Sequence, residues 1–285
     1  MKIIKSIGKL RHDLGCLRLN GKAVGFVPTM GYFHEGHLDL MRRSVKENGI
    51  TVVSLFVNPT QFGPQEDLAR YPRDLKRDAA LARGVGVDLL FVPSVEEMYP
   101  GPVSTFVEAG RIGEVLCGVS RPGHFRGVAT VVLKLLNIVA PDVLYLGQKD
   151  AQQVAVIGQM ARDLNVPVRI VVCPTRREPD GLAMSSRNIY LSPSQRKEAP
   201  VIFQALTSAG RKVSSGERDG NKIISEIKLL LKKKTSARID YVSVVDAENL
   251  SPTKCIQRDV LIAVAAWFGH TRLIDNLVVK VNAKK

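Results

Sequence analysis

Five short apolar runs rich in β-branched residues constrain this chain more than any other feature of its sequence. Segments with helical spacing of apolar residues separate them, at residues 37–48, 67–83, 128–139 and 151–164. Short continuous apolar runs are typical of strands buried on both faces of a parallel sheet. The alternation of strand and helix therefore predicts an α/β fold, a Rossmann-like doubly wound parallel sheet. The expected strands are residues 23–27, 51–57, 88–92, 142–146 and 168–173.

The pattern changes after the turn signal Pro179-Asp180-Gly181. Two helices are expected there, at residues 194–213 and 221–234, followed by strands near residues 239–245, 260–267 and 277–281. We therefore predict two domains. Residues 1–178 form the Rossmann-like domain, and residues 179–285 form a smaller C-terminal α+β domain.

Polar segments follow the five apolar runs directly. They read PTMGYFHEGH, NPTQFGP, PSVEEMYP, GQKDAQQ and PTRREPDGLAMSSRN. In an open parallel sheet the carboxyl ends of the strands share one edge, and ligands bind in the crevice outside that edge. We expect these five segments to converge on one site, with the C-terminal domain closing over it.

Composition narrows the class of protein. The four cysteines lie far apart with no CxxC pair, which favours neither a disulfide framework nor a zinc site and is typical of the cytoplasm. The longest apolar run is too short to span a bilayer, so we expect a soluble cytoplasmic protein without a membrane partner. The net charge of +14 is compatible with nucleic acid, a membrane surface or anionic substrates, and does not choose among them.

The HxGH core of PTMGYFHEGH is the most informative motif. Gly31 and Gly36 allow backbone amides to approach phosphate oxygens at the start of a helix. His34 and His37 are three residues apart, so both imidazoles face one side of a helical turn and can donate hydrogen bonds to an α-phosphate. They could instead be surface or capping residues, or a metal pair. A metal pair is disfavoured because no third Cys or His is near, although carboxylates could serve.

Two further motifs are weaker when taken alone. In GQKD, Lys149 can reach a phosphate and Asp150 can cap the next helix. The segment Met184–Asn188 supplies two hydroxyls and a guanidinium that could hold a triphosphate and the leaving pyrophosphate. Each could equally be solvated or capping. The order of HxGH followed by MSSRN, however, resembles the paired signatures of the HIGH nucleotidyltransferase superfamily.

The ordered motifs resemble one family closely. PTMGYFHEGH, FVNPTQFGPQED, RPGHFRGVATVV, GQKDAQQ and DGLAMSSRN match the pantothenate synthetase family over residues 27–191, and IDYVSVVD and AAWFGHTRLIDN extend the match over nearly the whole chain. The resemblance implies an AMP-forming pantoate–β-alanine ligase. It implies ATP and Mg²⁺, a pantoyl adenylate intermediate, release of AMP and pyrophosphate, and a homodimer. The sequence does not identify protein ligands for the magnesium ion.

The resemblance also implies residue roles. His37, His34 and Lys149 would be catalytic, and Gln61 and Gln153 would hold pantoate, with Gln61 also near β-alanine. Arg176 departs from the valine often found at its position and is expected to contact adenine through its backbone; Tyr32-Phe33 also departs from the smaller residues of many relatives. The implied ATP site comprises Met30, Gly31, His34, Gly36, His37, Gly147, Gln148, Lys149, Asp150, Arg176, Met184, Ser185, Ser186 and Arg187.

Two other functions are weighed against this one. A related enzyme could transfer a nucleotidyl group to a phosphorylated substrate and stop, in which case pyrophosphate release would not depend on β-alanine. An RNA-binding module could use the positive charge. Against that module, the sequence has no basic stripe interleaved with aromatic residues, and its aromatic content is only 6%. We therefore expect small-molecule substrates and no nucleic acid.

Overall fold

A six-stranded parallel sheet forms the larger part of the computed structural model, which describes residues 1–19, 21–64 and 66–281. The strand order is β1-β4-β3-β2-β5-β6, and each neighbouring pair is parallel. The expected Rossmann-like sheet is thereby confirmed, with β1 as an additional strand that the sequence pattern did not predict. The strands are β1 Lys2–Ile4, β2 Val24–Thr29, β3 Ile50–Leu55, β4 Leu89–Phe91, β5 Val143–Gly147 and β6 Arg169–Cys173.

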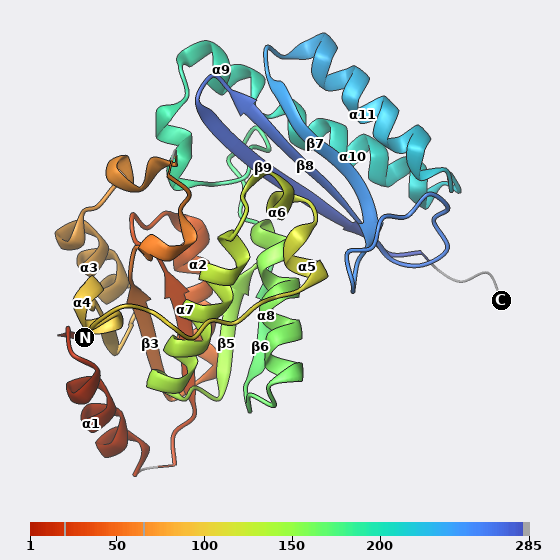
Figure 1. The fold of residues 1–285 in the computed structure, drawn as a ribbon. Coiled ribbons are helices and arrows are strands. Elements are labelled where there is room, and N and C mark those ends of the chain that lie inside the picture. The colour runs from red at the N-terminus through yellow and green to blue at the C-terminus, as the bar shows by residue number, and fades with distance from the viewer. Residues whose placement is uncertain (20, 65, 282–285) are drawn as a thin grey trace.

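Helices cover both faces of this sheet because neighbouring strand residues point to opposite sides. Phe26 packs in the core beneath α1 Ile7–Arg18, α7 His124–Val139 and α8 Ala151–Asp163, whereas Val27 packs in the core beneath α2 Glu35–Glu47 and α3 Leu75–Gly84. Figure 1 shows the sheet between these helices. Shorter elements lie in the connections: η1 Pro59–Gln61, η2 Asp67–Arg70, α4 Val95–Met98, α5 Arg111–Glu114, α6 Cys117–Ser120, η3 Gln148–Asp150 and η4 Ser186–Tyr190.

Two helices predicted as continuous are each divided near a proline. Residues 67–83 form η2 and α3, with Pro72 between them, and residues 194–213 form α9 Pro193–Glu198 and α10 Val201–Ser214, with Pro200 between them. Proline lacks the N–H that a helix interior needs, and it disfavours helical geometry in the residue before it. The apolar spacing continues across both interruptions, and the predicted single helices were wrong for that reason.

A second, antiparallel sheet follows in the order β7-β8-β9, comprising β7 Arg238–Asp246, β8 Val260–Phe268 and β9 Thr271–Val279. Helices α10 and α11 Gly220–Lys234 cover one of its faces (Figure 1). The predicted α+β arrangement of the smaller C-terminal part is therefore confirmed. Strand β9 begins earlier than expected because Gly269, at φ 59°, and His270 turn β8 directly into β9. The predicted boundary between residues 178 and 179 stays a prediction.

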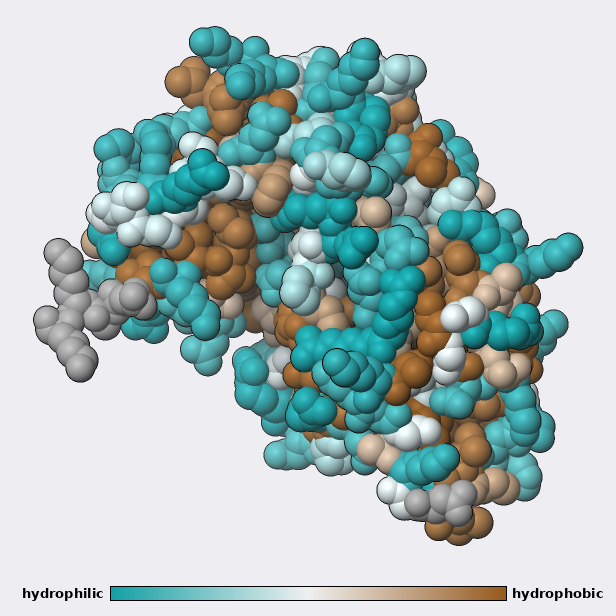
Figure 2. Space-filling model, turned by 180° about the vertical axis from the view of Figure 1, so that it is seen from behind, coloured by the Kyte–Doolittle hydropathy of each residue, from teal (hydrophilic) through white to brown (hydrophobic). Residues whose placement is uncertain are grey.

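The second sheet lies beyond the carboxyl ends of the parallel strands (Figure 1). Ile274 of β9 and Tyr241 of β7 pack against the core of the larger sheet. Seen from behind, the surface is indented between the two parts (Figure 2). Within the described residues no helix is long and apolar enough to cross a membrane, and the four cysteines are unpaired.

Candidate functional site

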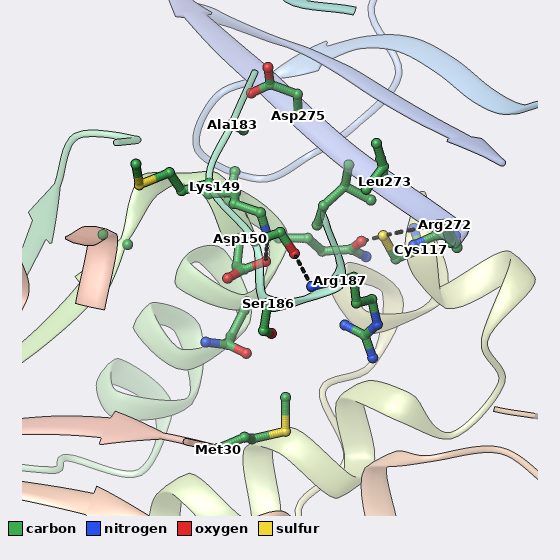
Figure 3. A pocket seen from close by; sticks show the side chains of 18 of the residues that line it. Met30, Cys117, Lys149, Asp150, Ala183, Ser186, Arg187, Arg272, Leu273 and Asp275 are labelled. Atoms are coloured by element: carbon green, nitrogen blue, oxygen red, sulfur yellow. Dashed lines mark hydrogen bonds and ion pairs between the residues drawn. The ribbon is translucent and has the colours of Figure 1, made fainter. Parts of the chain in front are cut away.

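A pocket of about 870 Å³ opens between the two sheets, at the carboxyl ends of β2, β5 and β6. The chain runs outward from β2 through β3 and β4, then returns to place β5 on the other side of β2. Ligands bind at such a reversal of strand order in open α/β sheets. Figure 3 shows Met30, Lys149, Ser186 and Arg187 around this pocket, with β9 along one side.

Four of the five polar segments converge on the pocket, and PSVEEMYP does not. Its residues Pro93, Ser94 and Glu97 border a separate hollow, so this part of the prediction was wrong. The physical reason is strand order, because β3 separates β4 from β2. The segment contributes indirectly, since the Tyr99 hydroxyl donates a hydrogen bond to Asn58 Oδ1 at 2.9 Å.

Two of the predicted site residues, Gly31 and Gln148, lie outside the pocket wall. A β-carbon at Gly31, where φ is 89°, would lie 3.1 Å from Asp78 Oδ2 and from Leu55, so the glycine shapes the loop from behind. The Gln148 side chain instead donates to Asn276 Oδ1. The pocket is lined by the other predicted residues: Met30, His34, Gly36, His37, Gln61, Gly147, Lys149, Asp150, Gln153, Arg176, Met184, Ser185, Ser186 and Arg187.

The two histidines of HxGH lie together at the start of α2, with ring centroids 4.1 Å apart. His34 is the N-cap residue, and its Nδ1 accepts from the Gly36 N–H at 3.1 Å. His37 Nδ1 accepts from the His34 N–H at 3.3 Å. The expectation that both rings face one side is confirmed, and the capping alternative is also correct, because the pair forms a reciprocal capping box.

Both imidazoles are neutral at pH 7. Burial, followed by the nearby Lys149 ammonium, lowers the pKa of His34 to about 4. Burial, followed by the charges of His34 and Lys149, holds the pKa of His37 well below its usual value. A neutral ring that accepts at Nδ1 carries its proton on Nε2. Each histidine therefore keeps one Nε2–H donor that its capping bond does not use.

Lys149 and Asp150 follow β5 directly, in η3, and form an ion pair of 3.3 Å. Asp150 occupies the N-cap position of α8, but its side chain makes no capping hydrogen bond. The expectation that it caps this helix was therefore correct for position and wrong for the bond. Its carboxylate is 46% exposed and lines the pocket beside the lysine (Figure 3), so it is available to a ligand.

The loop that carries Ser185, Ser186 and Arg187 is held by one residue of η2 and by the residue that follows η2. The Arg187 guanidinium donates to both carboxylate oxygens of Asp67 at 2.8 Å, and Ser186 Oγ lies 3.3 Å from the Tyr71 hydroxyl. These contacts fix the guanidinium at the pocket wall. Phosphate binding by Arg187 would have to share or replace its pairing with the carboxylate.

Arg176 also lies at the pocket, and its side chain is 51% exposed, 3.5 Å from Asp39. Its backbone carbonyl accepts from the Met184 N–H at 3.0 Å, which ties the strand end to the following loop. The N–H of Arg176 and the second lone pair of its carbonyl are the backbone groups that could contact an adenine base.

Adjacent glutamines on α8 have different surroundings. Both border the pocket, but the Gln152 side chain is buried and its amide is already engaged, since it accepts from the Cys117 N–H and donates to the carbonyls of Ile112 and Val115. Gln61 is also buried, and its amide lies 3.1 Å from Met30 Sδ. Gln61 and Gln153 are thus at the pocket as predicted, and Gln152 fastens the segment containing α5 and α6.

Sequence reasoning missed a chain of hydrogen bonds behind Gln61, which we call the His124 relay. The Arg121 guanidinium pairs with Glu66 and donates to His124 Nε2 at 2.9 Å, and His124 Nδ1 donates to the Gln61 carbonyl at 2.8 Å. Burial, followed by the Arg121 charge, lowers the pKa of His124 to about 4, which keeps this ring neutral. The RPGHF segment carrying Arg121 and His124 follows no strand, so sheet topology gave no reason to place it here.

The described residues contain no group of three or more His, Cys, Asp and Glu side chains arranged to hold a metal ion. Three carboxylates at the pocket already have arginine partners: Glu66 with Arg121, Asp67 with Arg187, and Asp275 with Arg177. Asp150 is the most exposed of the four.

The fold and pocket define a class: a Rossmann-like α/β protein with neutral imidazoles, an ammonium and a guanidinium lining one pocket at the topological switch point. The family model for pantoate-beta-alanine ligase matches residues 2–278. The chain therefore belongs to the pantoate–β-alanine ligase family.

Individual relatives agree over nearly the whole chain. A pantothenate synthetase from Thermotoga petrophila is 55% identical, covering 98% of this chain and 99% of the relative, and one from Moorella thermoacetica is 51% identical, covering 99% and 100%. The crystal structure of pantothenate synthetase from Thermus thermophilus matches with a TM-score of 0.92 at 46% identity, covering 97% of this chain and 99% of that chain. A Francisella tularensis pantoate–β-alanine ligase, solved with beta-gamma ATP and β-alanine, matches with a TM-score of 0.79 at 35% identity, covering 98% and 97%.

Proposed function

We propose that this chain condenses pantoate with β-alanine to form pantothenate, using ATP and releasing AMP and pyrophosphate through a pantoyl adenylate. The observation that carries the proposal is the gathering of His34, His37, Lys149 and the Ser185–Arg187 segment around one pocket, in a chain of this family. The Francisella relative, whose structure contains beta-gamma ATP and β-alanine, supports the choice of substrates.

The first step is attack of a pantoate carboxylate oxygen on the α-phosphorus of ATP, with cleavage of the bond to the pyrophosphate oxygen. Negative charge accumulates on the phosphate oxygens during this displacement, and fixed donors stabilise it most when they need no reorganisation. The Nε2–H groups of His34 and His37 and the Lys149 ammonium are such donors. Ser185, Ser186 and Arg187 would hold the departing pyrophosphate.

The second step is attack of the neutral amine of β-alanine on the acyl carbon, with AMP as the leaving group and loss of one proton from nitrogen. A carboxylate needs the first step because its own oxygen is a poor leaving group. Gln61 and Gln153 would orient pantoate through amides that both donate and accept hydrogen bonds. The His124 relay holds the backbone of Gln61, which would also lie near β-alanine.

A magnesium ion fits this donor set as a phosphate-bound ion. Mg²⁺ prefers phosphate oxygens and water with one or two carboxylates. Asp150 would hold it, because its carboxylate is the most exposed of the four and meets Lys149 through one oxygen at 3.3 Å, whereas the other three pocket carboxylates have arginine partners. The bound ion would help neutralise the triphosphate charge.

The domain arrangement and assembly belong to the same proposal. Residues 1–178 would bind ATP and pantoate, and residues 179–285 would close over the site, as expected from the β9 residues in the pocket wall. Family membership leads us to propose a homodimer in the cytoplasm. Sedimentation equilibrium of the purified chain measures the assembly state directly.

One assay tests the reaction. Purified protein is incubated with ATP, Mg²⁺ and pantoate, with and without β-alanine, and pyrophosphate, AMP and bound adenylate are followed by mass spectrometry. We expect a stoichiometric burst of pyrophosphate and a bound pantoyl adenylate without β-alanine, and catalytic release of AMP with it. Turnover with a phosphorylated acceptor and no requirement for pantoate would favour nucleotidyl transfer instead. Salt-dependent RNA binding without turnover would favour the RNA-binding alternative.

A further inference from the structure

Strand β9 carries two adjacent polar residues that are both buried, Asp275 at 5% and Asn276 at 6% exposure. Adjacent residues of a strand point to opposite faces of the sheet. Asp275 lies on the face of Leu273, which packs against the helices of the smaller part, and Asn276 lies on the face of Ile274, which packs against the larger sheet. The strand thus presents a carboxylate on one side and an amide on the other.

The Asn276 amide fastens the turn that carries Lys149. Its Nδ2 donates to the backbone carbonyls of Gln148 and Lys149 at 3.0 and 2.9 Å, and its Oδ1 accepts from Gln148 Nε2 at 3.1 Å. Only a group with both donors and an acceptor can make these three bonds. A carboxylate of the same shape would place negative charge against two carbonyl oxygens.

The strand segment that carries the Asn276 side chain is also held from its opposite face. Asp275 accepts from Arg177 Nη1 and Nη2 at 2.7 and 3.0 Å. Arg177 also donates to the Gly181 carbonyl at 3.1 Å and lies 3.8 Å above the Phe203 ring. Figure 3 shows Asp275 beside the segment that carries Ala183, on the same side of the pocket as Lys149. The middle of β9 is therefore fixed between the two segments that face the phosphate site.

We infer that Asn276 is a positioning residue for the phosphate-activating step, acting through Lys149. The inference rests on the proposed function, because it assigns Lys149 to the transferring phosphate. Transition-state stabilisation depends on donors held within about 0.5 Å of their productive position. A lysine side chain is flexible, so the orientation of its backbone sets the region that the ammonium can reach. Asn276 sets that orientation without touching the substrate itself.

The test compares two reciprocal exchanges in the same sheet. Asn276→Asp keeps the shape and removes both donors. Asp246→Asn is the matched control, because Asp246 is also buried at 7%, lies in β7, and caps the Glu248 and Asn249 amides away from the pocket. In single-turnover pyrophosphate formation from ATP and pantoate, we expect Asn276→Asp to slow the rate about tenfold or more, and the control to stay within about twofold.

A double-mutant cycle with Lys149→Ala separates positioning from general damage. If Asn276 acts through Lys149, Asn276→Asp in the Lys149→Ala background changes the residual rate by less than about threefold. The same loss in both backgrounds overturns the inference, and so does a wild-type rate for Asn276→Asp alone. Should Asn276→Asp fail to fold, Asn276→Ala enters the same cycle, because it removes the donors without adding charge.

Failure of the proposed function has a different signature. In that case the wild-type chain releases no pantoate-dependent pyrophosphate. The positioning inference is then tested by measuring the affinity of each variant for α,β-methylene ATP by calorimetry. We expect Asn276→Asp to weaken binding in the wild-type background and to leave it unchanged in Lys149→Ala. Equal weakening in both backgrounds, or none in either, overturns the inference.

Discussion

Asp78 holds the backbone of Tyr32 in a left-handed conformation. The Tyr32 N–H donates to Asp78 Oδ2 at 2.6 Å, and φ at Tyr32 is 54°. The next amide, that of Phe33, donates to Asp78 Oδ1 at 2.7 Å. A non-glycine residue in this region is strained by roughly 1–2 kcal/mol. The carboxylate from α3 therefore stabilises the bend that places His34 and His37 at the pocket.

Asp78→Ala should destabilise the protein and slow adenylation together. It leaves two amides without an acceptor, and the carboxylate they now contact is fully buried. The expected loss in free energy of unfolding is about 2–4 kcal/mol, since each unpaired buried donor costs roughly 1–3 kcal/mol. Urea denaturation and single-turnover pyrophosphate formation measure the two effects.

Asp74→Ala is the matched control for that change. Asp74 caps the same helix by accepting from the Arg77 N–H at 3.0 Å, and within the described residues its side chain makes no hydrogen bond to the histidine loop. Loss of such a cap costs about 1 kcal/mol. The control should therefore keep a near-normal adenylation rate. An equal slowing by both variants would contradict the role given to Asp78.

His37→Ala and Lys149→Ala should each slow adenylate formation by roughly a hundredfold or more, as loss of a transition-state donor does. The overall fold should persist, because the changes remove side chains at the pocket wall. Lys46→Ala, on the exposed side of α2, provides the control for loss of a lysine. Rapid-quench single-turnover rates with ATP and pantoate measure the effect. Unchanged rates would remove both residues from the mechanism.

Gln153→Ala and Gln152→Ala should separate substrate binding from stability. Gln153 faces the pocket, so its loss should raise KM for pantoate about tenfold and leave ATP binding nearly unchanged, as expected for one polar contact of roughly 1–1.5 kcal/mol. Gln152 makes three hydrogen bonds to α5–α6 backbone groups, so its loss should lower the melting temperature. A parallel loss of ATP and pantoate binding in Gln153→Ala would argue against a pantoate contact.

This glutamine pair also illustrates what sequence can predict. The apolar runs were sufficient for five of the six parallel strands, and strand order explains why four of the polar segments meet. Periodicity alone could not distinguish Gln152 from Gln153, because the difference depends on where α5 and α6 pack against α8. The Asp78 contact and the His124 relay were equally invisible, since they join segments 45 and 63 residues apart through side-chain-to-backbone bonds.

Asp67→Asn should increase the affinity for ATP. Asp67 accepts from Nε and Nη2 of the Arg187 guanidinium and adds negative charge beside the proposed pyrophosphate position. Its removal should tighten ATP binding by about 3- to 10-fold, or roughly 0.7–1.4 kcal/mol, and lower stability slightly. Calorimetric titration with α,β-methylene ATP measures the change. Weaker binding would mean that Asp67 positions Arg187 for phosphate and does not compete with it.

The free energy of unfolding should decrease as the pH is lowered, before the carboxylates titrate. The pKa values of His34 and His124 are lowered to about 4, and that of His37 is also well below the value near 6.5 expected in the unfolded chain. Between these values the unfolded state binds more protons than the folded state, so stability rises with pH across this window. The stabilisation that comes from these neutral histidines is therefore fully present above about pH 6.5, and it is lost as the pH falls toward 4.

The expected loss in free energy of unfolding between pH 7 and pH 4.5 is roughly 2–3 kcal/mol for each of His34 and His124, at about 1.4 kcal/mol for each pKa unit over about two units. Urea denaturation at a series of pH values measures it. His124→Asn is the informative variant, because its amide can still donate to the Gln61 carbonyl but does not titrate. Its stability should depend less steeply on pH than that of the wild type. Identical slopes would show that His124 is not protonated on unfolding in this range, and a flat wild-type profile would contradict the neutral histidines on which the proposed donors depend.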